Sequence, residues 1–166
     1  PARPSERQAR IRQPASGEAA LAGRGIRLAA VIVDTLILMV LFWLASLFTP
    51  LNVFAPEMIE AGFVKKAAVQ LASLLMFAAV NGYLLATRGQ TVGKMLLGLR
   101  ITRADGSAAS LGRVLGLRYG VGYACGALHF SVLMIYSLLD CLMIFRANRR
   151  CLHDVIADTI VTANWR

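Results

Sequence analysis

The chain has 166 residues, of which 57% are hydrophobic and only 16% are charged, and its net charge is +9. Soluble domains carry about 25% charged residues, so this apolar excess cannot be buried inside one small soluble globule. The basic residues lie between apolar runs rather than on one amphipathic face, which argues against nucleic acid as a partner. These features together predict a single-domain integral membrane protein.

Three cysteines, Cys125, Cys141 and Cys151, have neither the CxxC spacing nor the Cys/His spacing of metal sites. The sequence therefore indicates no disulfide framework, no metal site and no cofactor. The first 25 residues are polar and rich in arginine, so they do not have the short apolar core of a signal peptide.

Residues 1–22 form a basic segment in which arginines stand among Pro, Ser, Gln and Ala. Such a composition cannot bury a core, so we predict a disordered N-terminal arm over residues 1–22 and a transmembrane domain over residues 23–166. Two interpretations of the arm remain open, namely contact with anionic lipid headgroups and a role in orientation alone.

Two apolar runs, residues 28–48 and 67–86, are long enough to cross a bilayer as helices. At a rise of about 1.5 Å per residue, each matches a hydrocarbon thickness of roughly 30 Å. The connecting residues 49–64 contain acids and no Lys or Arg, whereas residues 87–113 carry five basic residues and one acid. The positive-inside rule therefore predicts that both ends of this hairpin face the cytoplasm and that residues 49–64 face out.

A third apolar run, residues 114–145, would measure about 48 Å as one straight helix, which is too long for a bilayer. A straight helix would also place the following arginines outside, against the charge rule. We therefore predict a bent pair of shorter membrane helices that breaks near residues 122–126. Three spans remain the alternative.

Two β-like runs lie outside the apolar segments. Residues 98–103 precede an Asp105-Gly106 turn, which is a strong hairpin signal, and residues 158–165 form a matching run at the C-terminus. The predicted fold is an all-α membrane protein, with a transmembrane hairpin of two long spans, a bent pair of shorter helices and a small cytoplasmic β-hairpin or sheet.

An aspartate, Asp34, lies inside the first apolar run, seven residues after Arg27. A carboxylate at that depth costs roughly 2.5 to 3.5 kcal/mol, so Asp34 is a functional candidate. Both residues share one helix face, but Arg27 reaches back towards the cytoplasmic interface and a direct pair is not expected. Candidate partners of Asp34 are Arg118 and the inner basic loop. The alternative is a buried pair that only fixes helix packing.

Asp140 is the second acid in an apolar run and lies six residues before Arg146, near the same cytoplasmic interface. It either lines one inward-opening polar cavity together with Asp34 or stays solvated at a helix end. His129 lies in the middle of the run, where it either relays protons or makes one hydrogen bond in a packed core.

The stretch RGQTVGK, residues 88–94, is one residue short of a phosphate-binding loop, and Met95 stands where Ser or Thr is required. We therefore expect no nucleotide site, but a turn and an interfacial amphipathic helix with Lys94 at the headgroups. His153 and Asp154 are sequence neighbours that point different ways on a helix. No nucleophile elbow is present either, so we do not expect an enzyme.

Three blocks occur in a specific order, namely GIRLAAVIVDTLI, GQTVGKMLLGLRITRADG followed by SLGRVLGLR, and RRCLHDVIADTIV. Over about residues 23–162 the chain thereby resembles the RDD family of small bacterial and archaeal membrane proteins. The resemblance implies that Arg27 is the family's arginine and Asp34 its first aspartate, and that Asp154 is the second, with Asp140 as a rival. Further residues of the family motifs are Gln90, Gly93, Lys94, Arg100 and His153.

The resemblance implies either transport, including cation/proton antiport, or a place in a larger assembly. In the leading hypothesis Asp34, together with Asp140, lies on a proton or cation pathway whose charge Arg27 and Arg118 balance. Four short segments are few for a carrier, so this hypothesis calls for a homo-oligomer. The rival hypothesis is an accessory subunit that binds other membrane protein subunits through its lipid-facing surfaces.

Overall fold

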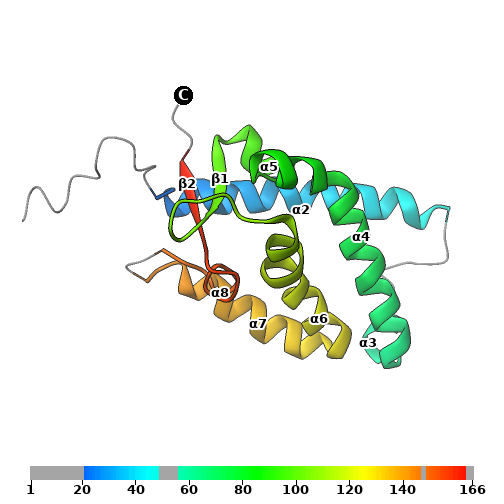
Figure 1. Ribbon diagram of the computed structural model, residues 1–166. Helices are drawn as coiled ribbons and strands as arrows, with labels where there is room; N and C mark the ends of the chain where they lie inside the picture. The colour runs from blue at the N-terminus through cyan, green and yellow to red at the C-terminus, as the bar shows by residue number, and fades with distance from the viewer. Residues whose placement is uncertain (1–20, 49–55, 147–148, 164–166) are drawn as a thin grey trace, which may run out of the picture.

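The computed structural model describes residues 21–48, 56–146 and 149–163, and its elements are mainly helical (Figure 1). In chain order they are α2 (Arg24–Ser46), α3 (Glu57–Glu60), α4 (Phe63–Arg88), α5 (Val92–Leu96), β1 (Leu99–Arg103), the π-helical segment η1 (Arg113–Tyr119), α6 (Gly120–Leu128), α7 (Phe130–Met143), α8 (Leu152–Ile156) and β2 (Thr159–Ala163). The prediction of a mostly helical chain with a small sheet is confirmed. Residues 1–20 of the predicted arm lie outside the described residues.

Among the described residues two helices, α2 and α4, are long and apolar enough to cross a membrane. Each begins four residues before its predicted start, because Gly23 and Gly62 are extended and the chain turns helical directly after them. The helix α4 ends at Gly89, whose φ of 64° is a left-handed conformation that favours glycine. Phe48 lies beyond the end of α2, so the predicted boundary at residue 48 is two residues too late.

The run over residues 114–145 folds as η1 and α6 followed by α7, so the chain bends here as predicted. The break lies at His129 rather than at residues 122–126. His129 has an extended backbone, and its Nδ1 accepts a hydrogen bond from the Ser131 N–H, so that it caps α7. Gly126 instead allows close packing of α6 on α4, because a Cβ there would lie 2.5 Å from the Gln70 side-chain nitrogen.

The sheet is antiparallel and joins β1 to β2, with Leu99 opposite Ala163 and Arg103 opposite Thr159. This is the predicted pairing of the two distant β-like runs. The predicted local hairpin is reduced to one bridge between Thr102 and Ala108, because the Asp105 carboxylate accepts hydrogen bonds from the backbone and hydroxyl of Ser107 and closes the turn by itself.

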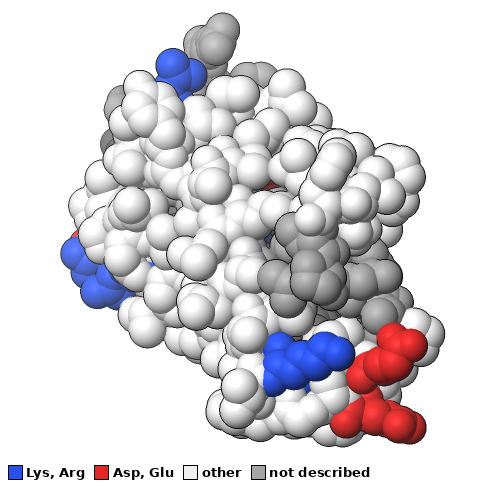
Figure 2. All heavy atoms as spheres, turned by 90° about the vertical axis from the view of Figure 1, so that its right-hand side faces the viewer, with Lys and Arg blue, Asp and Glu red and all other residues white. Residues whose placement is uncertain are grey.

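The buried core is small and lies where the sheet, α5 and η1 meet α2 and α4. Its fully buried members include Ala30, Leu85, Ile101, Val114 and Val161. Large apolar side chains are instead exposed along α2, α4 and α7, and the face seen in Figure 2 carries few charged side chains. Within the described residues α2 packs mainly on α5, so most of its length is without a protein neighbour.

Candidate functional site

Asp154 lies at the centre of a buried cluster of charges. Its carboxylate is fully buried and is paired with Arg27 of α2 through one oxygen and with Arg118 of η1 through the other. The Thr159 hydroxyl at the start of β2 lies 3.2 Å from the same carboxylate and accepts a hydrogen bond from Arg118. The cluster therefore joins α2, η1, α8 and β2 at one point.

Local sequence explains why α8 presents Asp154 inwards. Cys151 is the N-cap of α8, and its backbone N–H donates to the Asp154 carboxylate at 3.2 Å, which closes a capping box. Burial alone would raise the pKa of Asp154, but the charges of Arg118 and Arg27 outweigh it and hold that pKa well below its usual value. Asp154 is therefore ionised at neutral pH and stabilises both guanidinium groups.

Arg118 thus has a different partner from the one that the sequence suggested, and Arg27 shares that partner. As expected, Arg27 does not pair with Asp34; it also donates to the Arg149 carbonyl. Arg118 was a candidate partner of Asp34, and this prediction is wrong, because the π-helical turn of η1 directs it to Asp154. The assignment of Asp154 as the second family aspartate stays a prediction.

Asp34 lies eleven residues into α2 and binds the start of α5. Its Oδ2 accepts a hydrogen bond from the Thr91 hydroxyl at 2.5 Å, and its Oδ1 accepts one from the Gly93 N–H at 2.7 Å. Gly93 lies so close to α2 that a Cβ there would meet the Ala30 carbonyl oxygen and approach the Asp34 carboxyl carbon to 2.9 Å. Glycine at position 93 is therefore required for this contact.

Lys94 is buried and points towards Asp34, so the predicted place at the lipid headgroups is wrong. Its ammonium lies 3.9 Å from the Asp34 Oδ2, 3.5 Å from the Thr91 hydroxyl and 3.4 Å from the Tyr119 hydroxyl. The amphipathic pattern of α5 assigned the lysine to the surface, whereas the buried carboxylate of α2 supplies a counter-charge that favours burial.

Asn81 and the motif residue Gln90 hold the turn that leads to this Asp34 cluster. The side-chain oxygen of Asn81, buried in α4, accepts from the Val92 N–H at 2.9 Å, and Gln90 donates to the Leu99 carbonyl at 2.7 Å. Both contacts fix the turn between α4 and β1. Arg100, by contrast, is exposed on the sheet and belongs to neither charged cluster.

Asp140 of α7 does not join Asp34 in one cavity, which corrects that prediction. It is bound to His153 instead, with 2.7 Å between the imidazole Nδ1 and each carboxylate oxygen and 2.8 Å from the His153 N–H. His153 Nε2 lies 3.8 Å from the Asp154 carboxylate, so the neighbours His153 and Asp154 lie closer than expected. Burial and the charge of Arg118 lower the pKa of His153, which favours the neutral imidazole.

Cys151 lies next to the Asp140–His153 pair. Its thiol lies 3.7 Å from the Arg27 guanidinium, and burial raises the pKa of that thiol to about 11. The ligand atoms of Asp140, Cys151 and His153 all lie within 4.8 Å of one another. The spacing of the cysteines gave no reason to expect this group, because α7 and α8 are brought together only by the fold.

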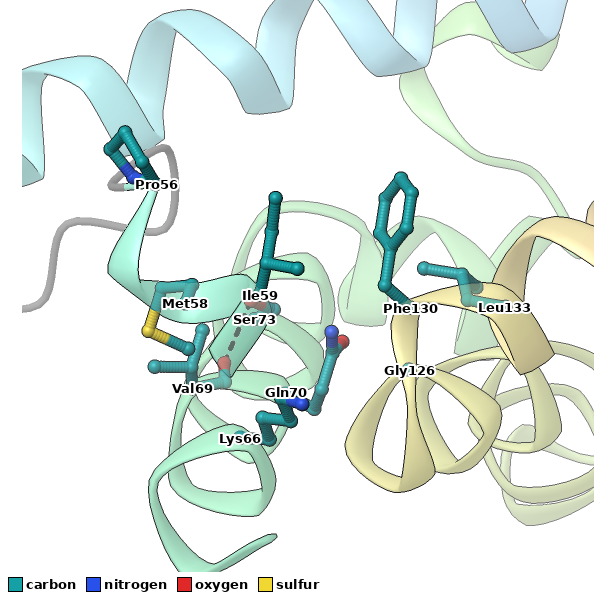
Figure 3. A pocket seen from close by; sticks show the side chains of 10 residues that line it. All are labelled: Pro56, Met58, Ile59, Lys66, Val69, Gln70, Ser73, Gly126, Phe130 and Leu133. Carbon is teal, nitrogen blue, oxygen red and sulfur yellow. Dashed lines mark hydrogen bonds between the residues drawn. The ribbon is translucent and has the colours of Figure 1, made fainter. Parts of the chain in front are cut away.

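A cavity of about 320 Å³ lies between α3, α4, α6 and α7, far along α4 from the Asp34 cluster (Figure 3). Lys66, Gln70 and Ser73 give it a polar side, and Phe130 and Leu133 of α7 give it an apolar one. Sequence reasoning missed this cavity and also missed Asn81, Thr91, Tyr119 and Thr159 as site residues. The signal for Thr91 was its place as an N-cap before α5.

Comparisons with known proteins confirm the family that the sequence predicted. The model of the RDD family matches residues 21–158. The chain is also 32% identical over 145 residues to the uncharacterized protein YckC of Bacillus subtilis (strain 168), and this alignment covers 85% of the chain and 83% of YckC. No solved structure matches the chain.

Proposed function

The chain belongs to the RDD family, and from this membership and the geometry above we propose that it is a multi-pass inner-membrane protein that exchanges a monovalent cation for protons at Asp34. The apolar helices α2 and α4 support insertion into a bilayer. The acids of α3 at one end of α4 and the basic residues after α4 support cytoplasmic termini, by the positive-inside rule.

The single observation that carries this proposal is the loose environment of the Lys94 ammonium. Three oxygens, from Asp34, Thr91 and Tyr119, surround it at 3.4 to 3.9 Å, which is longer than the 2.7 to 2.9 Å of a strong charge-assisted hydrogen bond. An ammonium among carboxylate, hydroxyl and phenol oxygens occupies the place that a monovalent cation prefers. A cation and Lys94 can therefore compete for the same carboxylate.

The exchange balances in charge. When a cation binds to the Asp34 carboxylate, the Lys94 ammonium releases one proton and the neutral amine gives up the carboxylate. When the cation leaves, Lys94 takes up one proton and pairs with Asp34 again. One cation is thereby exchanged for one proton, and the net charge of the buried cluster stays constant, which avoids an unpaired charge in a medium of low dielectric constant.

The buried face of α4 connects this cluster to the cavity. Ser73, Phe77 and Asn81 follow one another at intervals of four residues and are all buried. Ser73 lines the cavity and Asn81 belongs to the Asp34 cluster, about 12 Å further along the helix. Between them the Phe77 ring packs on Tyr119, with 4.4 Å between centroids, so that an aromatic barrier separates two polar regions.

The test is cation-dependent proton movement in proteoliposomes that hold the purified full chain and an internal pH dye. Asp34→Asn is expected to abolish cation-driven proton movement, because the amide neither neutralises a cation nor pairs with Lys94. Lys94→Gln is expected to keep cation flux and lose its coupling to the pH gradient. Asp105→Asn and Lys65→Gln are the matched controls, because both residues are exposed.

If Asp34→Asn inserts normally and moves protons at the wild-type rate, the proposal is wrong. An absence of flux in the wild-type chain for each of Na⁺, K⁺ and Li⁺ would also contradict it.

A second candidate function, an accessory subunit of a membrane complex, is favoured by the exposure of α2. Only 6% of its most apolar stretch is buried against the rest of the molecule, so Leu36, Val40 and Trp43 need lipid or another protein subunit as neighbours. For this function, purification in a mild detergent yields one stoichiometric hetero-complex, and Asp34→Asn changes stability without any effect on flux. For the transporter, the same purification yields a homo-oligomer.

A further inference from the structure

A group of three potential metal ligands lies apart from the Asp34 cluster, between the end of α7 and the start of α8. They are the Asp140 carboxylate, the His153 imidazole and the Cys151 thiol, and their ligand atoms all lie within 4.8 Å of one another. In a tetrahedral zinc site the bonds of 2.0 to 2.3 Å place neighbouring ligand atoms about 3.3 to 3.8 Å apart. Side-chain adjustments of roughly 1 Å therefore bring these three atoms into ligand positions.

We propose that Asp140, Cys151 and His153 bind a divalent transition-metal ion, Zn²⁺ being the best fit, at the junction of α7 and α8. One thiolate, one imidazole and one carboxylate are the ligands that zinc accepts in proteins. A thiolate ligand disfavours Mg²⁺ and Ca²⁺, which prefer oxygen alone. The site is independent of cation exchange at Asp34, which lies in another cluster.

The orientation of His153 supports the proposal. Its Nδ1 faces the Asp140 carboxylate at 2.7 Å, so a metal ion enters between two groups that already point at each other. The other ring nitrogen, Nε2, lies 3.8 Å from the fully buried Asp154 carboxylate. When Nδ1 binds the metal, the imidazole proton resides on Nε2 and faces Asp154, which gives the carboxylate–histidine–metal arrangement that orients ligands in known sites.

The surrounding charges permit a cation. Arg27 and Arg118 lie beside the site, and both are already paired with Asp154. The metal ion brings two positive charges, the thiol releases one proton and Asp140 contributes its negative charge, so the three ligands and the ion are neutral together. The ion itself displaces the thiol proton, and the Arg27 guanidinium lies 3.7 Å from the Cys151 sulfur.

Access and a fourth ligand position are also consistent with a site. The side chains of Asp140 and His153 are 17% and 20% exposed, so an ion can reach them from solvent. The Tyr136 hydroxyl, one turn before Asp140 on α7, is buried and has no hydrogen-bond partner among the described residues. This hydroxyl is therefore a polar group on α7 that remains available to a water molecule in the fourth position.

The test uses Co²⁺ as a spectroscopic probe on the full chain in detergent, after removal of metals with a chelator. The wild-type chain is expected to bind one Co²⁺ with a near-ultraviolet thiolate-to-metal band and the visible bands of a four-coordinate centre. Zn²⁺ should displace Co²⁺ and remove these bands, since it binds such ligands more tightly. Cys151→Ser should abolish the near-ultraviolet band while keeping an N-cap for α8.

The chain offers matched controls, because it contains three cysteines and two histidines. The double variant Cys125→Ser/Cys141→Ser and the variant His129→Asn should keep the full spectrum. His153→Asn and Asp140→Asn should weaken Co²⁺ binding by at least about 100-fold, more than the loss of an outer-shell partner.

Two results would overturn the proposal. One is a thiolate band that survives in Cys151→Ser or disappears in the control variants. The other is the absence of a thiolate band in the wild-type chain even when Co²⁺ is in excess over protein.

Thermal unfolding with and without Zn²⁺ is a second measurement, which does not depend on the Co²⁺ spectrum. Zn²⁺ should raise the melting temperature of the wild-type chain and leave that of His153→Asn unchanged, because a ligand that binds only the folded state stabilises it. An equal effect of Zn²⁺ on both proteins contradicts the site. Neither readout depends on cation flux.

Discussion

The carboxylates of Asp154 and Asp34 are both held by residues of other elements, but in opposite ways. Asp154 is fully buried and its two oxygens pair with two arginines from separate elements. Asp34 is 12% exposed, accepts two neutral hydrogen bonds and has one lysine at 3.9 Å. We therefore describe the Asp154 cluster as a fixed joint, whereas the proposed cation exchange requires that the charge partner of Asp34 can leave.

This distinction has a physical basis in the two cations. A guanidinium is planar, stays charged and binds carboxylates through paired donors. The two arginines of the Asp154 cluster therefore stay charged at neutral pH. A lysine ammonium is a compact point charge on a flexible chain and makes no paired, planar contact with a carboxylate. A site that must exchange charge is therefore better built from Asp34 and Lys94 than from Asp154 and its arginines.

The largest expected effect follows from removing the negative charge of the fixed joint. Asp154→Asn leaves two buried guanidinium groups without a counter-charge, and we expect a loss of about 3 to 5 kcal/mol in the free energy of unfolding. Denaturant unfolding of the purified chain in detergent measures it. The matched control is Asp158→Asn, because its carboxylate is 47% exposed and its ion pairs are worth roughly 0 to 1 kcal/mol. Equal losses in both variants would contradict the comparison.

The pH dependence of stability tests the same joint without mutation. The pKa of Asp154 is lower in the folded chain than the unfolded value of about 3.9, so its contribution is complete above that pH and is lost as the pH falls below it. In metal-free protein we therefore expect constant stability from this group between pH 7 and pH 5, and a steep fall below about pH 4. Asp154→Asn should lack this fall, which unfolding curves at each pH measure.

A smaller effect is expected at the contact between α2 and α5. Gly93→Ala places a methyl group against the Ala30 carbonyl and the Asp34 carboxyl, which should cost about 1 to 3 kcal/mol and displace Thr91 from Asp34. Gly116→Ala is the matched control, because its added Cβ meets no atom within 4 Å and alanine favours helix. If both variants unfold at the same denaturant concentration, α5 is not docked on Asp34 as described.

The helices and the sheet were accessible from the sequence because their signals are local. Apolar runs of fixed length predicted α2 and α4, and the excess length of residues 114–145 predicted the bend. The exact break at His129 was missed, since it depends on a side-chain cap rather than on glycine. The pairing of β1 with β2 was predicted because these are the two β-like runs outside the apolar segments.

The charged clusters could be predicted only in part, because their members are far apart in the sequence. Arg27 and Asp154 are 127 residues apart, and the family resemblance named each residue without predicting their contact. Lys94 was placed at the surface because an isolated amphipathic pattern contains no information about a carboxylate on another helix. Asp140 was joined to Asp34 by equal depth alone, whereas the direction of α8 gives it His153.

The smallest effect concerns Asp158, which lies between α8 and β2. Its φ of 49° lies in the left-handed region, which an aspartate tolerates better than most residues. Asp158→Gly removes this strain but also removes exposed pairs with Arg150 and Arg103 at 3.2 and 3.8 Å, so we expect a net change within about 1 kcal/mol.

Salt separates the two contributions at this position. In about 1 M salt the exposed pairs are screened, so Asp158→Gly should become more stable than the wild-type chain, while Asp158→Asn, which keeps the left-handed tolerance, should match it. Unfolding curves at low and high salt measure the difference. A large, salt-independent loss in either variant would show that Asp158 belongs to the fixed joint rather than to its solvated edge.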